Sequence, residues 1–152
     1  MKTITEKDSN ISLRLLDDSL HLERTATQTK ILNPKSKQRY IINDCGFNTT
    51  DIHVNVPDVS DWAAGKYKYD GSSWSANTDH IPMAQLTEAI SSSVNEIPVS
   101  YIETFLNSGT VKILDEQITY TGKENGKLTG CTRGANSTTA AAYQFNVSVI
   151  GV

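Results

Sequence analysis

The sequence predicts an all-β protein built from two small antiparallel β modules, each like a small barrel or sandwich. Apolar residues alternate with polar ones in short runs, the runs end at turn-forming residues, and no strand–helix–strand alternation is visible. A chain of 152 residues suits one medium domain or two small ones. We expect a first module over residues 1–76, a linker over 77–94 that could hold a short helix, and a second module over 95–152.

The first module is predicted from four alternating runs separated by turns. Asp17, Asp18 and Ser19 break the first run, and a second turn surrounds Asn33 and Pro34. Pro57 should end the last run, because proline cannot donate to a strand ladder. The expected strands cover residues 11–15, 20–22, 40–42 and 52–56.

Aromatic residues concentrate around one predicted hairpin. Asp70 and Gly71 tolerate the positive φ of a tight turn, and they lie between Tyr67 and Tyr69 on one side and Trp74 on the other. These three rings could pack across the strands, fill an interface, or stack on sugar rings of a glycan. They are therefore candidate interface or binding residues.

A change in composition separates the modules. Residues 75–80 are polar, and after Pro82 the residues Met83, Leu86 and Ile90 recur at helical spacing. Pro82 would fit the first position of a short helix, where its missing N–H is not needed. An irregular connector is the alternative.

The second module is predicted from short strands around a second tight turn. Asn125 and Gly126 give the strongest hairpin signal of this part of the chain. A loop of small residues at 135–142 precedes a final alternating run at 145–149. If that last strand pairs back to the first, the module closes into a compact barrel or roll.

Composition and charge argue against several partners. A net charge of −3 does not suit nucleic-acid binding, which needs a basic face. The basic cluster of Lys30, Lys35, Lys37 and Arg39 surrounds a predicted turn and is interpreted as solvated. No apolar run is long enough to span a membrane, and no apolar leader follows Met1.

No residue pattern predicts catalysis, a cofactor or a metal. His21, His53 and His80 lie in unrelated contexts, and no nucleophile elbow or glycine-rich phosphate loop is present. Cys45 and Cys131 lack metal-ligand spacing and suit a reducing cytoplasm, although a disulfide between them stays open.

Two acidic pairs are interpreted as solvated turns. Asp17 and Asp18 lie in a predicted turn, and Asp115 and Glu116 lie between two predicted strands. Adjacent carboxylates on a strand point to opposite faces, so neither pair could act jointly on one substrate.

Arg133 is the one charged residue singled out as a candidate contact. It lies in the loop TGCTRG. Its forked guanidinium could bind an anionic partner, or it could hydrogen-bond loop carbonyls and hold the turn, which is the role we favour.

The run at residues 108–142 resembles a pattern found in structural proteins of tailed bacteriophages. It reads SGTVKILDEQITYTGKENGKLTGCTRGANSTTAAA, and its most specific part is LTGCTRG at 128–134. That pattern commonly continues with a histidine, where this chain has Tyr143. A second phrase, DWAAGKYKYDGSSW, is similar to short modules of marine and cyanobacterial phage virion proteins.

The resemblance implies a component of the virion, assembled in the host cytoplasm and without enzyme activity. Its partners would be other virion proteins and copies of itself. A tail, baseplate or fibre-attachment adaptor is the expected role, with a capsid decoration protein or a host-glycan-binding module as alternatives. Assembly should bury apolar residues that the monomer exposes, several of them among Tyr67, Tyr69, Trp74, Phe105 and Phe145.

Overall fold

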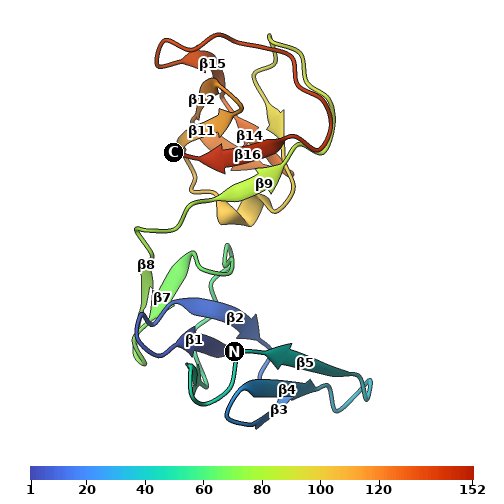
Figure 1. The fold of residues 1–152 in the computed structure, drawn as a ribbon, viewed down its shortest axis with the longest axis vertical. Helices are drawn as coiled ribbons and strands as arrows, with labels where there is room; N and C mark the ends of the chain where they lie inside the picture. The colour runs from blue at the N-terminus through green and yellow to red at the C-terminus, as the bar shows by residue number, and fades with distance from the viewer. The chain divides into compact units, whose positions relative to one another are not determined.

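The chain is all-β, as predicted, in a computed structural model that describes residues 1–152. Its strands are β1 to β16, and its helical structure is a single short 3-10 turn (Figure 1). The chain divides into two compact units, Met1–Thr78 and Asp79–Val152. It contains no helix with the length and apolar character needed to cross a membrane.

The first unit contains two three-stranded antiparallel sheets and a hairpin. One sheet has the order β2-β1-β6, the other has the order β3-β4-β5, and β7 pairs with β8. The strands are β1 (Lys2–Glu6), β2 (Ser12–Leu16), β3 (His21–Arg24), β4 (Gln28–Leu32), β5 (Arg39–Asn43), β6 (Thr50–His53), β7 (Tyr67–Tyr69) and β8 (Trp74–Ala76).

Hydroxyl groups share the interior of the first unit with a small apolar core. The Thr3 hydroxyl lies 2.7 Å from the Ser12 hydroxyl and donates to the carbonyl of Arg14, and Thr50 donates to the carbonyl of Gly46. Such bonds remove the cost of burying polar groups. The buried apolar residues are Ile4, Ile31, Cys45, Val56 and Tyr69.

The second unit is a small roll of two sheets. The five-stranded sheet has the order β15-β12-β11-β16-β9, and the three-stranded sheet has the order β10-β14-β13. Its elements are β9 (Met83–Gln85), β10 (Ile97–Pro98), η1 (Ile102–Thr104), β11 (Gly109–Ile113), β12 (Glu116–Tyr120), β13 (Gly122–Glu124), β14 (Lys127–Thr129), β15 (Thr132–Ala135) and β16 (Ser148–Gly151).

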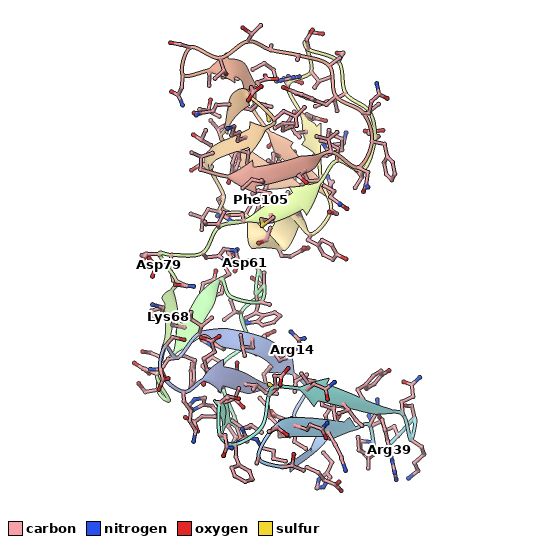
Figure 2. All side chains as sticks on the ribbon, viewed as in Figure 1. Arg14, Arg39, Asp61, Lys68, Asp79 and Phe105 are labelled. Atoms are coloured by element: carbon pink, nitrogen blue, oxygen red, sulfur yellow. The ribbon has the colours of Figure 1, made fainter.

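Contacts between strand ends close this roll. The N–H of Thr121 donates to the carbonyl of Thr129 between the two sheets, and Leu86 forms a bridge with Val99. The core that they enclose includes Phe105, which is fully buried and is labelled in Figure 2. Its other large members are Leu86, Ile97, Ile113, Ile118, Tyr120, Leu128, Tyr143 and Val149.

The short helix considered after Pro82 does not form, so that option was wrong. Ala84 and Leu86 are buried whereas Met83 and Gln85 are exposed, which is the two-residue period of a strand. This strand, β9, pairs with β16. Backbone pairing over a sheet outweighs the weak helical spacing of a segment only about three turns long. Residues 79–94, predicted as part of a linker, lie within the second unit.

The Asn125–Gly126 turn is confirmed. Glu124 pairs with Lys127, so the loop has two residues, and both have positive φ, 50° for Asn125 and 77° for Gly126. This is the geometry of a type I′ turn.

Candidate interaction sites

The aromatic hairpin β7–β8 packs largely against itself. Tyr69 lies directly opposite Trp74, with ring centroids 4.8 Å apart, and the rings of Tyr67 and Trp74 meet edge to face at 6.3 Å. Tyr69 is 5% exposed, and its ring centroid also lies 5.1 Å from that of His53. Part of the ring surface that could stack on a sugar is therefore covered within the first unit.

The polar atoms of the two half-buried rings also have partners. Trp74 Nε1 donates to the carbonyl of Pro57 at 3.0 Å, and the Tyr67 hydroxyl donates to Asp61 at 2.8 Å. Burial and the neighbouring Asp61 carboxylate raise the pKa of Tyr67 to about 12. These bonds fix both rings within the first unit.

The turn of this hairpin differs from the two-residue turn that the sequence suggested. Tyr69 pairs with Trp74, so four residues, 70–73, form the loop. The Asp70 carboxylate accepts the N–H groups of Ser72 and Ser73, both at 2.8 Å, which lowers the pKa of Asp70. A side chain thus closes the turn, while Gly71 provides the positive φ.

Arg133 and Glu116 form a buried ion pair with two hydrogen bonds. Arg133 Nε lies 2.7 Å from Glu116 Oε1, and Nη2 lies 2.8 Å from Oε2. The side chains are 7% and 0% exposed. The guanidinium also donates to the carbonyls of Ser91 and Ala141 and lies over the ring of Tyr143. This is the bonding expected of the loop-holding role, and it leaves little of Arg133 for a partner.

Glu116 organises the other side of the same loop. Its two carboxylate oxygens accept the N–H groups of Gly134 at 2.9 Å and Ala141 at 3.1 Å. Burial alone raises the pKa of Glu116, but the hydrogen bonds from Arg133, Gly134 and Ala141 outweigh it and lower the pKa to about 2.

The interpretation of Glu116 as a solvated turn residue was wrong. Asp115 is exposed, but Glu116 begins β12 and points into the second unit. The acidic pair and Arg133 were predicted as two unrelated features. The one sequence signal that could have joined them is that both lie within the run at residues 108–142.

An exposed apolar patch on the outer face of β9 and β16 was not predicted. We call this group the β9–β16 patch, and it consists of Ile81, Met83, Ile150 and Val152. Met83 pairs directly with Ile150, and continuing that register places Ile81 opposite Val152. Ile81, Met83 and Val152 are 63%, 61% and 74% exposed. The helical interpretation hid this patch, because it separated Met83 from the final strand.

Two other residues that were expected to be buried by assembly, Phe105 and Phe145, differ in how exposed they are. Phe105 and Tyr69 are buried, 0% and 5% exposed, so the expectation that the monomer leaves them open for assembly was wrong for these two residues. Phe145 is 64% exposed. Among the five residues selected, it offers the most open apolar surface.

Two of the histidines lie beside threonine hydroxyls, and both cysteines are free. His80 Nε2 lies 2.9 Å from the Thr104 hydroxyl, and His53 Nε2 lies 3.1 Å from the Thr5 hydroxyl. Cys45 and Cys131 are free thiols in different units, and burial raises the pKa of Cys131 to about 11. No cluster of three or more histidine, cysteine or acidic side chains has metal-binding geometry.

Comparison with known proteins adds no relative. No protein-family model matches the chain, and neither a curated protein nor a solved structure matches it.

Proposed function

We propose that this chain is a non-enzymatic structural protein of a tailed bacteriophage particle, acting as a tail, baseplate or fibre-attachment adaptor. It docks to other virion proteins and to copies of itself. The β9–β16 patch is the observation that carries the docking role. The resemblance of residues 108–142 to phage structural proteins supports the particle as its setting.

The patch has the character of a protein-binding surface. Three exposed apolar side chains, those of Ile81, Met83 and Val152, lie together with the half-buried Ile150 on β9, β16 and the residues next to them, instead of being scattered singly among polar residues. Contiguous exposed apolar surface is costly in water and marks interaction sites. Lys112 lies opposite Ile150 on the next strand and gives the patch a polar border, as interface rims have.

The motif that suggests a phage origin has a structural use in this chain. Arg133 and Gly134 of the LTGCTRG run bind Glu116, and together they hold the loop after β15. A motif that stabilises a loop can recur in proteins at different places in a particle. This supports a virion setting while leaving the particular location to experiment.

Glycan binding is the competing function, and the aromatic hairpin gives it less support. The rings of Tyr69 and Trp74 contact each other, and the polar atom of Trp74 is bonded internally. Retention of the purified chain on host surface glycans, with loss of retention in Trp74→Ala, would favour this alternative.

The experiment that tests docking changes one residue of the patch. Met83→Glu places a charge in the apolar surface, and Gln85→Glu places the same charge on the same strand outside the patch. In phage produced from a genome encoding each variant, we expect Met83→Glu to be depleted from purified particles and Gln85→Glu to be retained. Equal incorporation of both would reject the patch as the docking surface, and absence of the unmodified chain from particles would reject the proposed function.

A further inference from the structure

The outer edge of β5 is an unpaired strand edge whose middle is apolar. In the sheet β3-β4-β5, β5 pairs only with β4. Tyr40 and Ile41 are 56% and 58% exposed. Figure 2 shows Arg39, the first residue of β5, at the end of this sheet away from the aromatic hairpin.

Hydrogen bonding along the sheet shows which groups of β5 face outward. The N–H of Asn33 donates to the carbonyl of Gln38, so this pair belongs to the hydrogen-bonded set of the β4–β5 ladder. Hydrogen-bonded pairs alternate along an antiparallel ladder, so Tyr40 and Ile42 direct their backbone groups toward β4. The N–H and C=O groups of Arg39, Ile41 and Asn43 therefore point away from the sheet.

Two other edges of the three-stranded sheets in the first unit, β3 and β2, are protected in ways that β5 is not. The opposite edge, β3, carries the polar residues His21 and Glu23, and Arg24 reaches from it to the carbonyl of Thr50 on β6. The edge of β2 is covered, because Ser12 accepts a hydrogen bond from the N–H of Gly65. Natural proteins protect free edges with charges, prolines or bulges, and the middle of β5 has none of these.

We propose that β5 pairs antiparallel with β5 of a second copy, with Ile41 on the two-fold axis. A two-fold axis perpendicular to the sheet keeps every side chain on its own face, so each residue of β5 must pair with a residue whose side chain lies on that same face of the sheet. This places Ile41 opposite Ile41, Tyr40 opposite Ile42, and Arg39 opposite Asn43. Each outward-facing pair then exchanges both of its backbone hydrogen bonds.

The side chains of β5 suit pairing with themselves. Aromatic–β-branched and β-branched–β-branched pairs are favourable across antiparallel strands. Lys37 and Arg39 lie toward one end of the strand, and Asp44 follows the other end. Antiparallel pairing brings the basic end of each copy beside the acidic end of its partner, whereas parallel pairing would bring like charges together.

The size of this contact limits its strength. Two five-residue strands bury less than the roughly 1,000 Å² of a stable interface, so we expect a weak dimer in solution. The contact becomes lasting where a particle holds several copies together, and in this respect the inference rests on the proposed function.

Disulfide trapping tests the pairing even when it is weak. In an antiparallel hydrogen-bonded pair the two Cα atoms lie about 5.5 Å apart, within the range of a disulfide. We expect Ile41→Cys to form a disulfide-linked dimer under mild oxidation. Lys30→Cys is the matched control, since Lys30 lies opposite Ile41 one strand further from the axis. One further strand spacing in each copy brings the distance between the two Lys30 Cα atoms to about 15 Å, which is too far for a disulfide.

A second pair of variants tests the register. Arg39→Cys and Asn43→Cys should each form no disulfide-linked dimer alone and should form one when mixed. The unmodified chain controls for Cys45 and Cys131, and circular dichroism checks that each variant is folded. Failure of Ile41→Cys to link, or equal linking by Lys30→Cys, would overturn the proposed pairing.

The result is separable from the proposed function. If the chain is present in particles but Ile41→Cys does not link, the β5 pairing is rejected and the virion role stands. If Ile41→Cys links but the chain is absent from particles, the pairing stands and the virion role is rejected.

Discussion

Glu116 of β12 and Arg133 of β15 are joined by two parallel hydrogen bonds, at 2.7 Å and 2.8 Å, inside the second unit. Both side chains are almost fully removed from water. The desolvation cost of each charge is offset only while the other is present. The end of β15 and the loop after it, where Gly134 and Ala141 are also bonded to this pair, should therefore depend on the two residues as a unit.

Arg133→Ala should destabilise the second unit strongly. It leaves the Glu116 carboxylate buried without its counter-charge, which costs about 3–5 kcal/mol in comparable buried pairs. Urea unfolding followed by far-UV circular dichroism measures the loss. The control is Lys127→Ala, which removes an exposed pair with Glu96 at 2.9 Å and should cost much less, because water screens exposed charges. Similar losses for the two variants would contradict the importance given to burial.

Stability of the second unit should fall in acid because of Glu116. Its pKa is lowered in the folded state from 4.5 to about 2, so its contribution is present above pH 4.5 and is lost as the pH falls toward 2. The linked free energy is on the order of 3 kcal/mol. Urea midpoints measured between pH 6 and about pH 2 should decline steeply for the unmodified chain. Glu116→Gln should be less stable at pH 6 and show a shallower decline, and parallel curves would reject Glu116 as the titrating group.

Gly126→Val should destabilise the β13–β14 hairpin for conformational reasons alone. Gly126 has φ of 77°, and a Cβ added there would meet nothing closer than the Val99 carbonyl at 4.0 Å. A β-branched residue at positive φ costs about 1 kcal/mol or more. Gly126→Asn is the matched control, because asparagine tolerates this region and should lose less. Thermal unfolding of both variants provides the comparison. Equal melting temperatures would show that the positive φ at residue 126 does not determine the loss of stability.

The sequence predicted features that depend on local chemistry. The Asn125–Gly126 turn and most strands of the first unit follow from turn residues and two-residue alternation, which act over a few neighbours. The segment after Pro82 could not be assigned in this way. Met83, Leu86 and Ile90 fit a helix and Ala84 and Leu86 fit a strand, and only pairing with β16, more than 60 residues later in the chain, decides between them.

The candidate sites show the same limit. Arg133, expected in a loop and found on β15, could be selected from the TGCTRG motif, but its partner Glu116 lies 17 residues earlier on another strand. Phe105 was among the apolar residues expected to be exposed in the monomer, and its enclosure by a closed roll is a long-range property. The free edge of β5 also depends on knowing that no other strand covers it.

The two-unit organisation predicts that each unit responds only to substitutions in its own core. Every strand pairing lies within one unit, and both tryptophans, Trp62 and Trp74, belong to the first. Tryptophan fluorescence therefore follows the first unit, while circular dichroism follows both. Gly46→Ala is suited to the first unit, because a Cβ at Gly46 would lie 2.3 Å from the Ala26 carbonyl oxygen and the Thr27 nitrogen.

We expect Gly46→Ala to cost about 1–3 kcal/mol, since backbone must move to relieve the overlap. Its fluorescence-detected urea midpoint should fall, whereas Arg133→Ala should leave that midpoint unchanged and shift only the remaining circular dichroism transition. The two substitutions act as controls for each other. If Arg133→Ala moved the fluorescence transition as far as the circular dichroism one, the two units would be unfolding as one cooperative body, and the division near residue 78 would not be a division in stability.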